Sequence, residues 1–151
     1  MARWLYRHHV PKIPGFLQRL NYFFTGCDLP PTVPVGRGTR FTHYGAGVIV
    51  NNWAIIGERV TIMPHVVIGE NVREGMSGQA HIMIGNDVLL GVGAKIIASK
   101  DLQIGDRSVL GANAVVLDSV PQDCLAVGVP ARIIPRRKDA SKDSSGSKPN
   151  S

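Results

Sequence analysis

An aliphatic residue returns every six residues through the middle of this chain, from Val50 to Leu117. Glycine is the second residue in six of the eight hexads, which begin at Val50, Ile56, Ile62, Ile68, Ile84, Leu90, Ile104 and Leu110. An α-helix cannot use a period of six, because 3.6 residues per turn would scatter these side chains around its surface. The period fits a short strand followed by a tight turn.

A unit this short cannot bury its own apolar face, so it must stack on its neighbours to form a solenoid. Three hexads close one triangular turn of chain, with the aliphatic residue at the first position and the small residue at the fifth pointing inward. Glycine at the second position suits a backbone that turns sharply or approaches another stretch of chain closely. The sequence therefore predicts an all-β fold, a parallel β-solenoid, and the period alone leaves its handedness open.

The repeat loses its six-residue frame in three places. The first contains His43, and the second is a Gly-rich loop over residues 74–80 that ends at His81. The third is a two-residue insertion around Lys100 and Asp101. Local sequence rules fail preferentially at functional sites. The two interruptions that carry a histidine are therefore the first places to look for chemistry.

Length and charge limit the class of protein. The 151 residues suffice for one domain with a core and a short tail. The net charge is +6, and residues 136–151 hold five basic and two acidic residues, so half of that charge belongs to the tail. The remaining basic residues form no stripe with interleaved aromatic residues, which is the pattern of nucleic-acid binding. We predict no nucleic-acid partner.

The pattern divides the chain into an N-terminal helical segment at residues 1–26, a solenoid at residues 27–135 and a tail at residues 136–151. The tail is rich in serine, lysine and aspartate, so we expect it to be disordered. In the first segment, Pro14 suits the start of a short helix that carries apolar residues at helical spacing, namely Phe16, Leu17, Leu20, Phe23 and Phe24. This face either packs on the solenoid or a neighbouring subunit, or makes a peripheral contact with a membrane.

The sequence favours a location in the cytoplasm. If the N-terminal segment makes a peripheral membrane contact, the location is the inner face of the membrane. The first residues are not followed by an apolar run long enough for a signal peptide or a membrane span. Cys27 and Cys124 lie far apart and show no CxxC spacing, which is typical of reduced thiols in a cytoplasmic protein.

The hexads resemble the left-handed parallel β-helix of the hexapeptide-repeat acyltransferases, which supplies the expected handedness. The stretch from Asp28 through Gly36-Arg-Gly to His43 is similar to the segment that carries the Asp/His dyad of serine acetyltransferases. The run Gly128-Val-Pro-Ala-Arg resembles the end of the solenoid in these enzymes. The resemblance implies that His43 is the general base and Asp28 its partner. The non-catalytic alternatives are a histidine at a subunit contact and an aspartate that caps a turn.

Transfer of an acetyl group from a thioester to a hydroxyl explains why such a pair is needed. A base must take the hydroxyl proton as the oxygen attacks, and imidazole suits this because its unperturbed pKa of about 6.5 lies close to working pH. A carboxylate on the other ring nitrogen fixes the tautomer and stabilises the imidazolium. Neither cysteine lies beside His43 in the sequence, so we expect direct attack without a covalent acetyl-enzyme.

The resemblance implies further site residues. His81 corresponds to a second active-site histidine that contacts the substrate or the acetyl group, and Tyr44 is expected to contact the substrate. Contacts with acetyl-CoA, the expected co-substrate, are implied at Gly69, Val92 and Ala112, with Arg132 near its phosphates. For the glycine and the alanine, coil geometry alone is an equally good explanation. His65 is more simply a solvent-facing or interface residue. The family also implies a homotrimer whose active sites lie between subunits.

The expected acceptor is a sugar hydroxyl in bacterial capsule or exopolysaccharide synthesis. Serine acetyltransferases have an acidic residue before the base histidine and an arginine before the second one, where this chain has Thr42 and Ala80. Serine would leave its charges poorly paired without them. The short N-terminal region and the sequence His43-Tyr44-Gly45 also look like polysaccharide O-acetyltransferases. The alternatives are a serine O-acetyltransferase of cysteine synthesis and a non-catalytic scaffold.

A metal enzyme of the carbonic anhydrase type shares this solenoid and needs several histidine ligands, including a close pair on one coil. The close pair in this chain, His8-His9, lies outside the repeat. We expect no metal.

Overall fold

The structure is a computed structural model that describes residues 13–71 and 80–136. The predicted tail at residues 136–151, apart from Arg136, lies outside the described residues. The same holds for the Gly-rich loop at 74–80, apart from Ala80, and for residues 1–12 of the predicted N-terminal segment.

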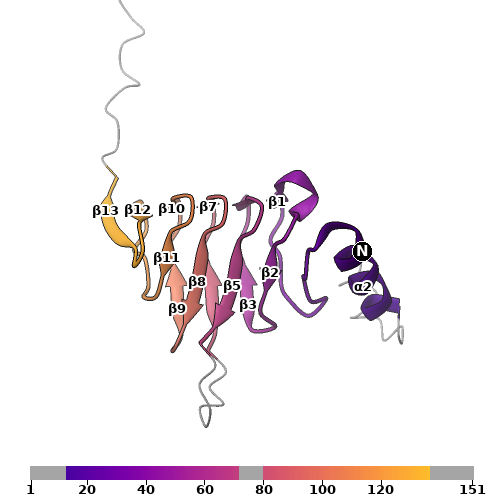
Figure 1. Ribbon diagram of the computed structural model, residues 1–151. Helices are drawn as coiled ribbons and strands as arrows, with labels where there is room; N and C mark the ends of the chain where they lie inside the picture. The colour runs from indigo at the N-terminus through magenta and orange to yellow at the C-terminus, as the bar shows by residue number, and fades with distance from the viewer. Residues whose placement is uncertain (1–12, 72–79, 137–151) are drawn as a thin grey trace, which may run out of the picture.

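Short strands stack into three sheets around one axis (Figure 1). The first sheet contains β1 (Arg40–Phe41), β4 (Thr61–Ile62), β7 (Leu89–Leu90), β10 (Val109–Leu110), β12 (Cys124–Val127) and β13 (Arg132–Pro135). The second contains β2 (Ile49–Val50), β5 (Val67–Glu70), β8 (Lys95–Ala98) and β11 (Val115–Val116). The third contains β3 (Ala54–Ile56), β6 (Ile82–Ile84) and β9 (Leu102–Ile104). Paired strands are parallel except β12 and β13, which are antiparallel.

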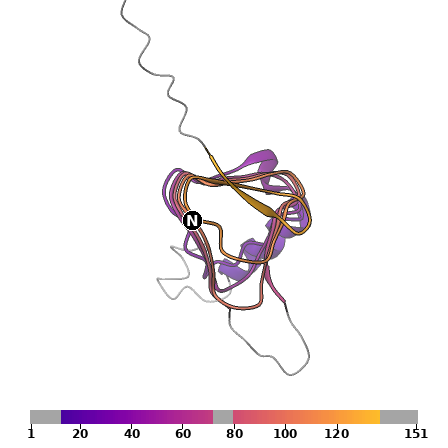
Figure 2. The ribbon, with the colours of Figure 1, turned by 90° about the vertical axis from the view of Figure 1, so that its left-hand side faces the viewer.

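Seen along the axis, the three sheets form the sides of a triangle (Figure 2). Three columns of turns form its corners. The first corner, between the first and second sheets, contains residues 42–48, 63–66, 91–94 and 111–114. The second corner, between the second and third sheets, contains residues 51–53, 71, 80–81, 99–101 and 117–119. The third corner contains residues 57–60, 85–88, 105–108 and 121–123. The predicted parallel β-solenoid is confirmed.

The strand register stacks the hexad aliphatics directly above one another. Ile62 pairs with Leu90, and Leu90 pairs with Leu110. All three side chains are 0% exposed. A fully buried aliphatic side chain of this kind contributes roughly 1.5–3 kcal/mol relative to an exposed one. The column of aliphatic residues predicted from the six-residue period is therefore the core of the fold.

Each coil longer than eighteen residues carries its extra residues at a corner. Phe41 pairs with Ile62, 21 residues later, and the three extra residues lie at the first corner. Ile62 and Leu90 are 28 residues apart, and Leu90 and Leu110 are 20 apart. The ten and the two extra residues both lie at the second corner. The interruptions seen in the sequence thus enlarge two of the three corners.

The third corner keeps a regular length and carries exposed ion pairs between coils. Arg59 Nε lies 2.7 Å from Asp87 Oδ1, and Arg107 Nη2 lies 2.6 Å from Asp123 Oδ2. The hydrogen bond from Arg59 holds the pKa of Asp87 below its usual value. Pairs so exposed contribute little to stability. This corner has a structural explanation, which leaves the first two corners for function.

Helix α2 (Ile13–Thr25) lies across the N-terminal end of the solenoid (Figure 1). It is attached through hydrogen bonds from Asn21 Nδ2 to the carbonyl of Cys27 at 3.2 Å and from the Gly47 N–H to the carbonyl of Thr25 at 3.1 Å. The predicted helix is confirmed, with Pro14 in its first turn.

The apolar face of α2 stays open. The side chains of Phe16, Phe23 and Phe24 are 63%, 80% and 73% exposed. The prediction that this face packs on the solenoid is therefore wrong for these rings, because the helix contacts the first coil through its polar residues and its last turn. A contact with a neighbouring subunit stays a prediction. Among the described residues, no helix has the length and apolar character needed to cross a membrane.

The turn after β7 leaves no space for a side chain at Gly91. A Cβ atom added to Gly91 would lie 2.6 Å from the backbone oxygen of Leu110 on the next coil, whereas at Gly69 the nearest atom would be a side-chain carbon at 3.8 Å. We expect Gly91→Ala to lower the free energy of unfolding by about 1–3 kcal/mol through overpacking. The matched variant Gly69→Ala should change it by less than about 0.5 kcal/mol. Urea denaturation followed by circular dichroism measures both, and equal effects would contradict this account of the turn.

Candidate active site

The three extra residues of the first corner build an unusual turn that carries His43. The turn is the short helical segment η1 (Thr42–Gly45). Inside it, His43 has φ 49° and ψ 45°, and Tyr44 has φ 58° and ψ 17°. Single left-handed residues recur at other corners, at Arg59, His65 and Asp87 for example, whereas His43 and Tyr44 are two in succession, which costs more free energy. The turn exposes both side chains, and Tyr44 is 89% exposed.

Cys27 lies directly beneath this turn. The coil that joins it to Gly45 is longer than eighteen residues, since Asp28 is bridged to Ile49, and its enlarged turn brings Gly45 over Cys27. A Cβ atom added to Gly45 would lie 3.2 Å from the Cys27 Sγ atom. The thiol is 4% exposed, and burial raises its pKa above the usual value. In the folded chain Cys27 thus lies under the turn of His43, although the two residues are distant in the sequence. Its thiol is covered and neutral, so it does not act as a nucleophile.

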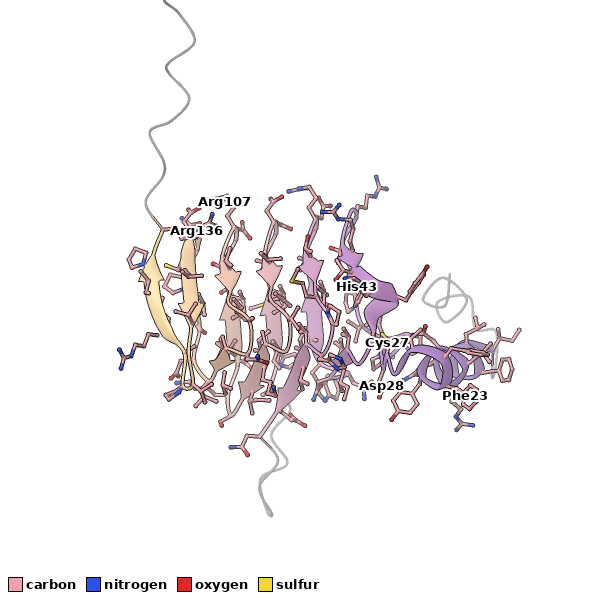
Figure 3. The ribbon with its side chains drawn as sticks, turned by 45° about the horizontal axis from the view of Figure 1, so that its top comes forward. Phe23, Cys27, Asp28, His43, Arg107 and Arg136 are labelled. Carbon is pink, nitrogen blue, oxygen red and sulfur yellow. The ribbon has the colours of Figure 1, made fainter. Side chains whose placement is uncertain are left out.

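Asp28 lies beside β2 at the same end of the solenoid as His43 (Figure 3). Its N–H donates to the carbonyl of Val48 at 2.8 Å, and its carbonyl accepts from the N–H of Val50 at 2.9 Å. The carboxylate Oδ1 accepts a hydrogen bond from Gln18 Nε2 of α2 at 2.7 Å. Among the described residues, no hydrogen bond or ion pair joins Asp28 to His43. The structure brings the two predicted dyad residues to one end of the molecule without joining them.

A cavity of about 440 Å³ opens beside Asp28. It is lined by Gly15, Gln18, Arg19, Tyr22 and Asp28. The cavity therefore combines an acidic side chain, a basic side chain and two polar groups. The sequence analysis missed Gln18 and Arg19 as site residues, since on a helix with an aromatic face they look like ordinary exposed polar residues.

The first corner continues along the solenoid as a column of exposed residues. The N–H of His65 donates to the carbonyl of Ala46, and the N–H of Asn113 donates to the carbonyl of Val92, each at 2.8 Å. Val92 is 41% exposed, and Ala112 is exposed next to Asn113. Two of the predicted coenzyme A contacts therefore lie on the same edge as His43.

The remaining predicted contacts lie elsewhere. Gly69 is half-buried in β5, on the sheet that follows this edge, and Arg132 is exposed on β13 at the far end of the solenoid. His65 is exposed in the single chain, as expected for a solvent-facing or interface residue.

His81 lies at the second corner, where the insertion-bearing turns meet. Its backbone N–H donates to Asp101 Oδ1 at 2.9 Å, and its Nδ1 atom lies 3.5 Å from the same oxygen. The rings of His81 and Trp53 pack edge to face with centroids 6.0 Å apart. The hydrogen bond from His81 holds the pKa of Asp101 below its usual value. The sequence analysis found the insertion that carries Asp101 but gave it no role.

One chain does not bring the two predicted histidines together. His43 lies at the first corner and His81 at the second, and the sheet containing β2, β5, β8 and β11 separates these corners. Within residues 13–71 and 80–136, no group of three or more His, Cys, Asp or Glu side chains could hold a metal ion.

No protein-family model matches the chain. A serine acetyltransferase from Synechococcus elongatus is 38% identical over 136 residues, which are 90% of this chain and 54% of that protein. A serine acetyltransferase from Helicobacter pylori strain J99 is 35% identical over 134 residues, which are 89% of this chain and 75% of that protein. The chain belongs to the serine acetyltransferase-like family of hexapeptide-repeat acyltransferases.

Solved structures of this family share the fold. A serine acetyltransferase from Brucella abortus in complex with coenzyme A superposes with a TM-score of 0.79 at 34% identity, over 89% of this chain and 52% of that chain. The soybean serine acetyltransferase complexed with serine gives 0.78 at 34% identity, over 88% and 53% of the two chains. The solenoid is a left-handed β-helix, as the resemblance implied. The chain spans little more than half the length of several family members that it matches.

The comparisons overturn the predicted sugar acceptor of polysaccharide synthesis. The relatives are named serine acetyltransferases. The prediction relied on the missing charges at Thr42 and Ala80, on the assumption that only these two positions can hold the charges of serine. The chain also has charged side chains elsewhere, since Arg19 and Asp28 line one cavity.

The buried state of Cys27 gives the first test of this serine acetyltransferase-like site. In a Cys124→Ser variant, iodoacetamide at pH 7 should alkylate Cys27 at least about tenfold more slowly in the native protein than in urea, because the thiol is covered and its pKa is raised. Mass spectrometry measures both rates, and the unfolded sample is the control. Equal rates would show an accessible thiol beneath His43 and would contradict the covered turn.

Proposed function

We propose that this chain is the catalytic part of a serine O-acetyltransferase, which transfers the acetyl group of acetyl-CoA to the hydroxyl of L-serine in cysteine synthesis. The observation that carries the proposal is the similarity to serine acetyltransferases over nine tenths of the chain, with His43 presented on a left-handed turn. Family members whose structures contain coenzyme A or serine support both substrates. The buried cysteines agree with a reducing compartment such as the cytoplasm.

His43 acts as the general base that takes the proton from the serine hydroxyl. Its exposed position on the first corner leaves the ring free to reach an acceptor. Asp28 stabilises the imidazolium that forms, after a side-chain movement toward His43. Gln18 supports this role because its amide occupies Oδ1 of Asp28 and leaves the other oxygen available. The covered thiol of Cys27 favours direct attack by serine over an acetyl-enzyme.

The cavity beside Asp28 is where a zwitterionic acceptor fits this chain. The guanidinium of Arg19 can pair with the carboxylate of serine, and the polar side chains of Gln18 and Tyr22 line the same cavity. Tyr44, exposed on the same turn as His43, offers a further substrate contact.

The coenzyme A arm lies along the first corner in this proposal. The exposed side chains of Val92 and Ala112 provide an even edge next to the coil of His43, with Gly69 on the adjoining sheet. Arg132 supplies a positive charge for the phosphates of coenzyme A. Arg137 and Lys138, the next basic residues along the chain after Arg136, lie outside the described residues.

A homotrimer completes the site. Because His43 and His81 lie at different corners of one triangle, threefold packing places the first corner of one subunit against the second corner of its neighbour. His81 of the neighbour then contacts the acceptor or the thioester beside His43. The open face of α2 is available to a subunit contact in the same assembly.

The base is tested by replacing His43 with asparagine. Both His43 and His65 are exposed and have positive φ angles of 49° and 60°. Asparagine tolerates this conformation, so His43→Asn and His65→Asn form a matched pair. We expect His43→Asn to lower kcat with L-serine by about 10²–10⁴-fold and His65→Asn to leave it nearly unchanged. Release of the coenzyme A thiol measures the rate.

Acetyl-CoA turnover without any acceptor dependence, or equal loss in the two variants, would contradict the role of His43. Binding of coenzyme A without turnover of serine would contradict serine as the acceptor, and failure to bind coenzyme A would favour a non-catalytic scaffold.

The shared site is tested by mixing subunits. His43→Asn and His81→Ala proteins should each be nearly inactive as homotrimers. After denaturation and refolding together, random mixing restores both histidines in roughly a quarter of the sites, because each site takes one histidine from each of two neighbours. The regained serine-dependent activity measures this fraction, with each variant refolded alone as the control. No recovery in mixed trimers would show that both histidines act from one subunit.

A further inference from the structure

The two-residue insertion at the second corner delivers a carboxylate to His81. The coil from Leu90 to Leu110 is two residues longer than a regular coil, and the extra residues lie at this corner. The insertion contains Lys100 and Asp101, and these residues point to different partners. Lys100 Nζ lies 3.4 Å from Asp118 on the following coil, whereas Asp101 faces His81 on the preceding coil. Lys100 is therefore engaged away from Asp101.

One oxygen of Asp101 contacts both the backbone and the ring of His81. Oδ1 accepts the backbone N–H of His81 at 2.9 Å and lies 3.5 Å from Nδ1. The carbonyl of His81 accepts the N–H of Leu102 at 2.9 Å, directly after Asp101. The preceding N–H, that of Ala80, donates to Glu70 Oε2 at 3.3 Å. The main chain entering β6 is thus held by two carboxylates in succession.

Trp53 forms the opposite side of the His81 ring. The two rings pack at an interplanar angle of 65° with centroids 6.0 Å apart. Trp53 belongs to the coil before His81, and Asp101 to the coil after it. The imidazole therefore lies between an aromatic ring and a carboxylate, while its side chain is still 51% exposed. Because Nδ1 faces Asp101, Nε2 is the nitrogen directed away from the carboxylate.

We propose that Asp101 is a positioning residue for His81, which holds the imidazole with its proton on Nδ1 and presents Nε2 to the acceptor or the thioester. The role of His81 in turnover rests on the proposed function, whereas the tautomer and direction of its ring do not. A carboxylate on one ring nitrogen selects the tautomer and fixes the ring direction. Apo distances such as 3.5 Å shorten when a site closes around its substrate. Trp53 limits the rotation that would take the ring off this carboxylate.

Asp118 provides a matched control on the same corner. Its side chain and that of Asp101 are both 74% exposed, and each contacts a basic side chain of the preceding coil: Asp118 pairs with Lys100, and Asp101 faces His81. Replacement of Asp118 therefore removes an equally exposed carboxylate from the same corner without touching His81. Asp101→Ala removes the acceptor from His81, whereas Asp101→Asn keeps an oxygen there without the charge.

The experiment combines imidazole ¹⁵N NMR with kinetics on the full-length chain. For wild type at neutral pH we expect the His81 signals of the Nδ1–H tautomer, a shift toward the Nε2–H tautomer in Asp101→Ala, and no shift in Asp118→Ala. A His81→Gln variant assigns the signals. For L-serine turnover we expect kcat to fall about tenfold in Asp101→Ala, with Asp101→Asn in between and the KM for acetyl-CoA nearly unchanged.

An unchanged tautomer in Asp101→Ala would overturn the inference, and so would equal loss of kcat in the Asp101 and Asp118 variants. If wild type acetylates no serine, the proposed function fails while the NMR comparison still decides the position of the ring. If Asp101→Ala does not fold, Asp101→Asn carries the test, and an unchanged spectrum and unchanged kcat in that variant would overturn the proposal.

Discussion

The stacking of aliphatic side chains at one spacing along the axis is the constraint on which the rest of this molecule depends. Ile62, Leu90 and Leu110 lie above one another with no exposed surface, so each coil must present its aliphatic residue at the same place. Glycine at the turns allows the backbones to approach at this distance. The sides of the triangle therefore tolerate no change in length, because an added residue there would turn every following side chain to the wrong face.

Extra residues are accommodated at the corners, and the candidate chemistry follows them. Three additional residues at the first corner allow the left-handed turn that exposes His43. Two at the second corner bring Asp101 to His81. The third corner keeps the regular length and holds exposed ion pairs instead. The two enlarged corners of a rigid frame carry the two histidines, and threefold assembly is the geometry that would bring these corners together.

Much of this could be predicted from the sequence, since the period, the glycines and the frame interruptions are local properties. The acceptor was predicted wrongly. The prediction assigned the charges of serine to the positions of Thr42 and Ala80, while the charged cavity beside Asp28 is lined by a helix that contains neither. Gln18 and Arg19 carry no local sign of a role, because a polar residue on a short helix is common. Their position against Asp28 follows from how α2 docks on the first coil.

The sequence by itself determined the solenoid, its core and the corners that depart from regularity, because a six-residue period has one physical use in a chain that must bury aliphatic side chains. It also identified His43, His81 and Asp28 as candidates. Only the tertiary structure decided which residues these candidates contact. Asp28 contacts Gln18, Cys27 lies beneath the His43 turn, and His81 lies between Trp53 and Asp101. These contacts join residues on different coils or on the helix, and their distances depend on the number of residues at each corner.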